Sequence, residues 1–205
     1  MKKIIAFCAF LCAVCMTIQA KNVEVGAEQT KQYLPLLKGK RVALLSNHTG
    51  IVIQGKDTIH TLDLLLKHGV EVTAIFSPEH GFRGTAREGE HVASSVDEKT
   101  GIPILSLYDG KSHRPSKEAM ATFDVLITDI QDVGLRFYTY YITMFRLMDA
   151  CAHEGKQFMV FDRPNPNGYY VDGPILNMKH KSGVGALPIP VVHGMTLGEL
   201  ALMIN

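Results

Sequence analysis

Short apolar runs alternate with helix-like patterns along this chain, and that alternation constrains the fold more than any other feature. The runs that read as buried strands are 41–47, 70–76, 102–108, 124–130 and 157–162. The helical patterns lie at 57–69, 116–123 and 140–155. Nearly continuous apolar strands separated by amphipathic helices are typical of a mainly parallel sheet with helices on both faces. The sequence therefore predicts an α/β fold.

Several boundaries follow from local signals. We expect the first helix to begin near Asp57 and the one at 140–155 to end at Gly155. A short strand is expected just before His193. A last helix begins at Thr196, where Glu199 completes a capping box. The chain ends soon afterwards on this apolar helix, so we expect a protein truncated before a further subdomain.

Composition excludes several classes of protein. The chain has 205 residues, of which 46% are hydrophobic and 20% charged, with a formal net charge of +1. These values are ordinary for a globular domain and too apolar for a disordered chain. Because no strong positive field is present, the composition favours neither nucleic acid nor an anionic membrane surface as a partner.

The N-terminus has the pattern of a secretory signal peptide. Lys2 and Lys3 precede an apolar stretch, and small or polar residues follow up to Ala20. The apolar stretch is short for a membrane span. We expect a signal peptide at 1–20, export to the periplasm or the extracellular space, and a mature domain at 21–205 that has no membrane anchor. An uncleaved anchor helix and a lipoprotein signal are the alternatives.

The mature chain would keep one cysteine, Cys151. One cysteine forms no intramolecular disulfide, no CxxC redox pair and no cysteine-based zinc cluster. Cys151 lies in an apolar helical pattern, which predicts a small core residue.

Polar clusters follow the predicted strands at the point where each strand ends. They are Asn47-His48-Thr49, Ser77-Pro78-Glu79-His80, Tyr108-Asp109, Asp129-Ile130-Gln131-Asp132, Asp162-Arg163-Pro164-Asn165 and His193. The carboxyl ends of parallel strands meet at one edge of a sheet, and ligands bind there. The sequence therefore predicts one polar site at this edge.

Most familiar catalytic motifs are absent from the sequence. It has no phosphate-binding loop, no GxGxxG after the first strand and no GxSxG elbow. These absences argue against a nucleotide-dependent enzyme and against a serine hydrolase. We expect no cofactor and no metal ion.

Carboxylates are the remaining chemical groups. Glu79 lies between Pro78 and His80, near apolar rings, where loss of solvent would raise the pKa of its carboxyl and suit a general acid. Its alternative is an ion pair with Arg83. The second carboxylate would come from a set of three: Asp129, Asp132 and Asp162. Asp129 or Asp132 would otherwise cap the helix that follows, and Asp162 would otherwise pair with Arg163.

The remaining polar residues can each be interpreted as functional or as structural. His80 and His193 would bind a substrate or serve as buried structural groups. Arg136 and Tyr138 offer a cation and a stacking ring suited to a sugar or an acidic substituent, whereas Tyr141 is predicted to be a core residue.

Six strings occur in order between about residues 34 and 205: "SNHTG", "FSPEHGFRG", "SLYDG", "TDIQDVGLRFYTY", "FDRPNPNG" with "VDGP", and "PIPVVHGMTLGELA". Together they resemble the NamZ-type exo-β-N-acetylmuramidases, a glycoside hydrolase family formerly classed as a domain of unknown function. The resemblance implies a Rossmann-like subdomain that faces a second subdomain across the active site. This chain matches the Rossmann-like half.

The resemblance also implies a function and a set of site residues. The enzyme would release terminal N-acetylmuramic acid from the non-reducing end of peptidoglycan fragments, so its partners would be muramyl saccharides. Glu79 would be the acid, with Asp129 or Asp132 activating water, stabilising charge or orienting the acetamido group. The residues implied in substrate binding are Asn47, His80, Arg83, Gln131, Arg136, Tyr138, Asp162, Arg163 and His193. Retaining and inverting outcomes both remain open, and the alternative function is a non-catalytic periplasmic module that binds cell-wall sugars.

Overall fold

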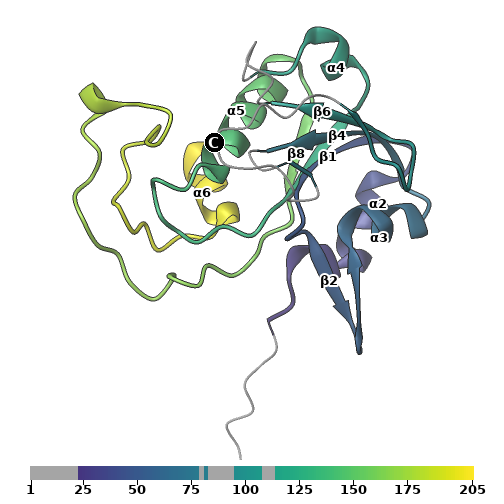
Figure 1. Cartoon of the computed structure of the whole chain (residues 1–205), viewed down its shortest axis with the longest axis horizontal. Helices are drawn as coiled ribbons and strands as arrows, with labels where there is room; N and C mark the ends of the chain where they lie inside the picture. The colour runs from purple at the N-terminus through teal and green to yellow at the C-terminus, as the bar shows by residue number, and fades with distance from the viewer. Residues whose placement is uncertain (1–22, 79–80, 83–94, 108–113) are drawn as a thin grey trace, which may run out of the picture.

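The computed structural model describes residues 23–78, 81–82, 95–107 and 114–205. Within these residues, all five predicted strands are present, and helices lie on both sides of the sheet that they form (Figure 1). The strands are β1 (Arg41–Ser46), β2 (Ile51–Gln54), β3 (Asp57–His60), β4 (Glu71–Ser77), β5 (Ser95–Val96), β6 (Pro103–Ser106), β7 (Val125–Asp129) and β8 (Gln157–Val160). The α/β prediction is confirmed.

The main sheet has the strand order β5-β6-β4-β1-β7-β8. All of its pairs are parallel except the pair of β5 with β6. The chain runs outward from β1 through β4 to β6 and then continues on the other side of β1 with β7 and β8. This doubly wound order is Rossmann-like, and its direction reverses between β1 and β7. The register there pairs Ser46 with Asp129, so the two strands end side by side.

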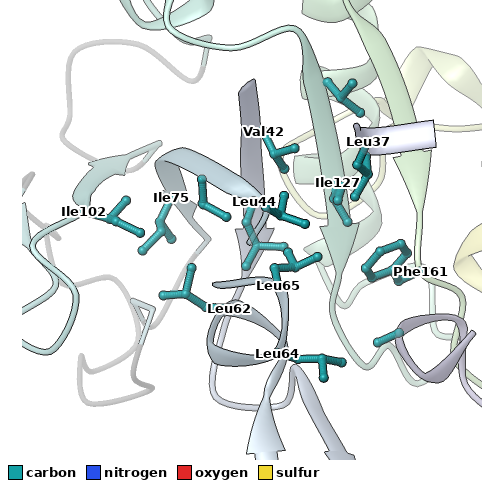
Figure 2. Packing of buried hydrophobic residues seen from close by; sticks show 14 of the residues in the cluster. Leu37, Val42, Leu44, Leu62, Leu64, Leu65, Ile75, Ile102, Ile127 and Phe161 are labelled. Carbon is teal, nitrogen blue, oxygen red and sulfur yellow. The ribbon is translucent and has the colours of Figure 1, made fainter. Parts of the chain in front are cut away.

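Helices cover both faces of the sheet. They are η1 (Gly26–Glu28), α2 (Thr30–Leu37), α3 (Thr61–Lys67), α4 (Lys117–Ala121), α5 (Tyr140–His153), η2 (Met178–His180) and α6 (Leu197–Ile204). Because successive strand residues point to opposite faces, Val42 and Leu44 pack beneath α2 and α3 (Figure 2), while Ala43 and Leu45 pack against α4 and α5. The continuous apolar character of β1 follows from burial on both sides.

Cys151 lies on α5 and is buried in the second of these two clusters. Burial raises the pKa of its thiol to about 12. Its prediction as a core residue is confirmed.

Two local predictions were wrong. Asp57 does not begin a helix: it lies in β3, which forms an antiparallel hairpin with β2. The helix begins after His60, whose Nδ1 accepts a hydrogen bond from the Leu62 N–H at 3.1 Å. The short strand expected before His193 is reduced to isolated bridges that Val192 makes with Leu135 and Asp172. In both places pairing with a neighbouring segment, rather than local pattern, decides the structure.

A long irregular excursion joins β8 to α6 and extends away from the sheet (Figure 1). It begins at Phe161 and ends at Thr196, and it contains the short helix η2. The capping box predicted at its end is present, because Thr196 and Glu199 exchange side-chain and backbone hydrogen bonds. Among the residues that the structure describes, no helix is long and apolar enough to span a membrane.

The first 3-10 helix lies directly on the backbone that follows β8. The Gly26 N–H donates to the carbonyl of Asp162 at 2.8 Å, and a Cβ added to Gly26 would lie 2.5 Å from the Asp162 nitrogen. We expect Gly26→Ala to lower the free energy of unfolding by about 1–3 kcal/mol, because backbone atoms must move to admit the methyl group.

Urea denaturation monitored by circular dichroism measures this change. Gly183→Ala is the matched control, since a Cβ at Gly183 meets no atom within 4 Å. Equal stability of the two variants would contradict the close approach at Gly26.

Candidate active site

Part of the expected polar set, Asn47, Asp129, Gln131 and Arg163, lies where β1 and β7 finish, at the point where the strand order reverses. Ligands of open α/β sheets bind in this position. The predicted site residues that the structure describes are Asn47, Asp129, Gln131, Asp132, Arg136, Tyr138, Asp162, Arg163 and His193. Glu79, His80 and Arg83 lie outside the described residues.

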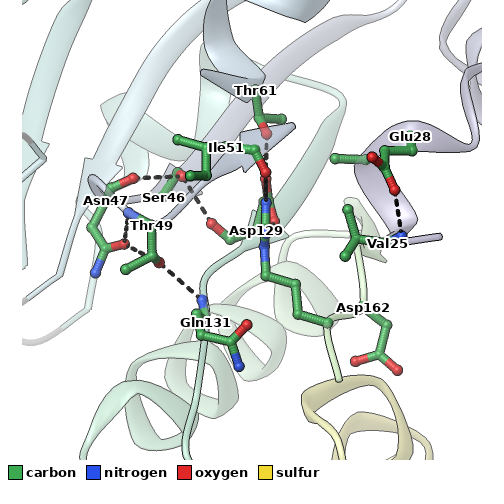
Figure 3. A network of polar contacts seen from close by, with 12 residues as sticks. Val25, Glu28, Ser46, Asn47, Thr49, Ile51, Thr61, Asp129, Gln131 and Asp162 are labelled. Carbon is green, nitrogen blue, oxygen red and sulfur yellow. Dashed lines mark hydrogen bonds and ion pairs between the residues drawn. The ribbon is translucent and has the colours of Figure 1, made fainter. Parts of the chain in front are cut away.

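Asn47 and Gln131 link the two strand ends through Thr49 (Figure 3). The Asn47 Oδ1 accepts hydrogen bonds from the Thr49 N–H and hydroxyl at 2.9 and 2.6 Å. The Thr49 Oγ1 in turn accepts the Gln131 N–H at 3.0 Å. The Asn47 Nδ2 group is buried and donates to none of the described residues, so it is a candidate donor to a ligand.

Asp129 is fully buried and forms an ion pair with Arg163. The guanidinium donates from Nε to Oδ1 at 2.6 Å and from Nη2 to Oδ2 at 3.1 Å. The Thr61 hydroxyl also donates to Oδ2, and Arg163 Nη2 reaches the Ile51 carbonyl at 3.0 Å. Both carboxylate oxygens therefore meet donors, and the charge is neutralised in place. This geometry favours a structural role for Asp129 over that of a base.

Asp162 does not pair with Arg163, whose guanidinium is taken by Asp129. Instead Asp162 accepts the Thr196 hydroxyl at 2.6 Å and the Gly198 N–H at 2.8 Å. A carboxylate at the first turn of a helix stabilises the free N–H groups and the positive end of the helix dipole. Asp162 thus holds the start of α6.

Asp132 lies in a different environment from Asp129, although the two are only three positions apart along the chain. It is buried, with 7% of its surface exposed, and its Oδ2 accepts the Gly134 N–H at 2.8 Å. Its Oδ1 has no hydrogen-bond partner among the described residues. Burial raises the pKa of this carboxyl to about 6, against the lowering effect of the N–H groups of Gly134 and Val133. Asp132 is the described carboxyl best suited to exchange a proton near neutral pH.

His193 faces Asp132 from the end of the long excursion. Its Nδ1 accepts the Met195 N–H at 3.3 Å, so in the neutral ring the proton lies on Nε2. That Nε2 lies 4.0 Å from the Asp132 Oδ2. Burial lowers the pKa of the imidazole, which favours the neutral form.

Arg136 holds the excursion to the segment between β7 and α5. Its Nη1 donates to the carbonyls of Pro174 and Ile189 at 2.7 and 2.6 Å, one on each leg of the excursion. The Nη1 group of this guanidinium therefore donates its hydrogen bonds to the protein backbone. Tyr138 is 48% exposed and available for stacking, whereas Tyr141 is fully buried, as predicted for a core residue.

Sequence reasoning missed Thr61, and it named Asn165 only as a member of a polar cluster, without a role. Thr61 supplies a hydroxyl to Asp129, and Asn165 donates to the Met195 carbonyl at 2.9 Å. The sequence pattern did not indicate Thr61, because the helix was expected to begin near Asp57. The β2–β3 hairpin shows that the helix begins at Thr61 instead. Asn165 had a signal, because it follows β8 in one of the predicted polar clusters. Among the described residues, no group of three or more histidine, cysteine, aspartate or glutamate side chains is arranged to hold a metal ion.

The fold and the site define the class of protein: it is a doubly wound, Rossmann-like α/β domain with acidic residues at the point where the strand order reverses. Comparison with known sequences then shows the family. Residues 42–205 match the family model described as "Exo-beta-N-acetylmuramidase NamZ, N-terminal", and the chain belongs to this family. The resemblance seen in the sequence is thereby confirmed.

Relatives of known name or structure agree. The chain is 45% identical over 192 residues to the peptidoglycan beta-N-acetylmuramidase NamZ of Bacillus subtilis (strain 168), covering 92% of this chain and 45% of that protein. A crystal structure of a DUF1343 family protein from Bacteroides fragilis NCTC 9343 is 61% identical, with a TM-score of 0.78 over 90% of this chain and 47% of that one. A second such protein from the same strain is 40% identical, with a TM-score of 0.79 over 89% and 45% of the two chains. The chain spans about half the length of these relatives.

The buried ion pair between Asp129 and Arg163 leads to a prediction about stability. Arg163→Met should lower the free energy of unfolding by about 3–5 kcal/mol, because it leaves a buried carboxylate without its counter-charge. The double variant Arg163→Met/Asp129→Asn should recover part of this loss, since it removes the charge as well. Urea denaturation of both variants measures the free energy of unfolding. A loss below about 1 kcal/mol in the single variant, which is the size typical of exposed ion pairs, would contradict the buried pair.

The raised pKa of Asp132 predicts how stability changes with pH. The folded protein binds this proton more tightly than the unfolded chain, so the stabilisation is complete below the ordinary pKa of 3.8 and is lost as the pH rises through about 6. The loss amounts to roughly 3 kcal/mol, at about 1.4 kcal/mol per pKa unit. In Asp132→Asn this contribution is absent.

Urea titrations of both proteins at several pH values between about 4 and 7 test it. The difference in unfolding free energy, wild type minus variant, should fall across that range. A constant difference would show that the Asp132 carboxyl titrates as it does in an unfolded chain.

Proposed function

We propose that this chain provides the Rossmann-like part of an exo-acting glycoside hydrolase. The enzyme would release terminal N-acetylmuramic acid from the non-reducing end of peptidoglycan fragments, as a step in cell-wall turnover. The observation that carries the proposal is the 45% identity to a protein named as a peptidoglycan beta-N-acetylmuramidase, which extends over 92% of this chain.

The proposed reaction needs two carboxyl groups. Most glycosidases use two carboxyl groups, one that protonates the leaving oxygen and one that acts on the opposite side of the sugar ring. In the proposed reaction Glu79 is the acid. The second carboxyl is Asp132 rather than Asp129, because Asp132 keeps an oxygen without a described partner while Asp129 is neutralised by Arg163.

The remaining rim residues would bind the sugar. Tyr138 offers an exposed ring on the segment between β7 and α5, and Asn47 offers the Nδ2 donor. Arg136 is committed to two backbone carbonyls. Arg83 is therefore the better candidate of the two arginines for the lactyl carboxylate that distinguishes muramic acid from glucosamine.

The N-terminal sequence supports a location for this activity. Lys2, Lys3, the apolar stretch and Ala20 form a signal-peptide pattern. Export would bring the protein to the compartment that contains peptidoglycan, so we propose a periplasmic or extracellular enzyme.

The decisive experiment measures N-acetylmuramic acid released from a disaccharide with muramic acid at its non-reducing end. It uses the protein at its natural full length. Glu79→Gln should lower kcat by roughly a hundred- to ten-thousandfold, the contribution of a general acid. Asp132→Asn should lower kcat by roughly a hundredfold or more for the same class of reason. Glu71→Gln is the control, since Glu71 is exposed at the amino end of β4, away from the rim.

Three results are distinguishable. Turnover that collapses in both site variants but not in the control supports the proposal. Saccharide binding without turnover by the wild-type protein would favour the non-catalytic binding module. Near-normal kcat in Glu79→Gln would remove Glu79 from the role of acid.

A further inference from the structure

The segments that carry Asp132 and His193 are joined to each other by their backbones. The His193 N–H donates to the Gly134 carbonyl at 3.1 Å, and the Arg136 N–H donates to the Val191 carbonyl at 2.8 Å. A bridge between Leu135 and Val192 lies between these two bonds. The two side chains are therefore held opposite one another by paired backbone, and their approach does not depend on long flexible side chains.

The imidazole has a defined orientation within this pairing. The Met195 N–H occupies Nδ1, so in the neutral ring the N–H is at Nε2, which lies 4.0 Å from the Asp132 Oδ2. Neither the Nε2 of His193 nor the Oδ1 of Asp132 has another partner among the described residues. A buried polar atom without a partner is costly and is retained where it serves a function.

We infer that His193 is a positioning residue for Asp132, and that its Nε2–H faces the carboxylate in order to stabilise the charged form that acts on the sugar or on water. This inference rests on the proposed function, because it assigns a role within the same reaction. His193 itself touches no reacting atom in this scheme.

The distance suits such a role without a direct bond. At 4.0 Å the contact is longer than a hydrogen bond. In buried surroundings, however, the N–H dipole still acts on the carboxylate, because the low local dielectric screens it weakly. The stabilisation would therefore be observed as a shift in the pKa of Asp132 rather than as a fixed ion pair.

Two other charged or titratable groups lie near this pair in the described part of the chain. Tyr141 on α5 packs edge-on against His193 with ring centroids 6.5 Å apart, and its hydroxyl accepts the Ala186 N–H. Arg136 lies four residues after Asp132 in the segment between β7 and α5 and donates to the two legs of the excursion. Both remain unchanged in the variants below, so a shift between variants reports on His193.

The sign of the effect follows from electrostatics. A donor that faces the charged form of a carboxyl lowers its pKa. Removing the donor should raise the pKa of Asp132 above its present value of about 6. If Asp132 acts as a carboxylate, the acidic limb of the pH–rate profile should then move to higher pH.

The experiment compares His193→Phe, which fills the space without an N–H, with His193→Gln, whose amide N–H reaches toward the former Nε2 position. The pH dependence of kcat and of kcat/KM is measured for N-acetylmuramic acid release by the full-length protein. In His193→Phe the acidic limb should rise by about one pH unit, with a larger change in kcat than in KM. In His193→Gln the limb should return toward the wild-type position.

His68→Gln is the control for removing a histidine, because His68 is exposed at the end of α3, before the amino end of β4. Circular dichroism of each variant confirms folding. An acidic limb that stays in place in a folded His193→Phe protein would overturn the inference, and so would an equal shift in both His193 variants.

A second readout separates this inference from the proposed function. Carboxyl carbon-13 NMR of aspartate-labelled protein, with the Asp132 signal assigned through Asp132→Asn, follows the titration of this group without any substrate. A higher pKa for Asp132 in His193→Phe supports the pairing even if the protein releases no muramic acid, in which case only the proposed function fails. An unchanged pKa in a protein that does hydrolyse the disaccharide would reject the role of His193 alone.

Discussion

The carboxylate of Asp129 lies at the centre of the rim with no exposed surface, and the arrangement around it depends on Arg163. Through this one pair the end of β7 is tied to the start of the excursion, to β2 at Ile51 and to α3 at Thr61. A buried charge of this kind is tolerated only when its partner is present and well oriented. The segments that form the site are therefore fixed relative to one another by electrostatics as well as by the apolar core.

Asp129 and Asp132 are identical in chemistry and nearly adjacent in sequence, yet the fold gives them opposite environments. Asp129 meets a guanidinium and a hydroxyl, whereas Asp132 is buried beside a neutral imidazole and keeps an oxygen without a described partner. Pairs of titratable groups whose surroundings differ in this way are how one site supplies both structure and proton chemistry. The same division supports Asp132 over Asp129 as the second carboxyl of the proposed glycosidase.

Much of the fold could be predicted from local pattern. The strands were readable because burial on both faces makes them continuously apolar, and the capping box of Thr196 was readable because it is contained within four residues. The hairpin of β2 and β3 was not, since a pattern of "DTIH" followed by a helix reads as one helix until cross-strand pairing is known. The contacts of Arg136 were not readable either, because its Nη1 donates to the carbonyls of Pro174 and Ile189, which are far from it in sequence.

The amino-acid sequence by itself determined the α/β class, the rim on which polar residues collect and the family to which the chain belongs, because each of these rests on periodicity or on local strings of residues. Only the tertiary structure decided how the charged groups on that rim pair: Asp129 with Arg163, Asp162 with the start of α6, and Asp132 opposite His193. The reason is physical. Pairing energy depends on distance and on burial, and both are set by strand register and by the path of a long excursion rather than by neighbours along the chain.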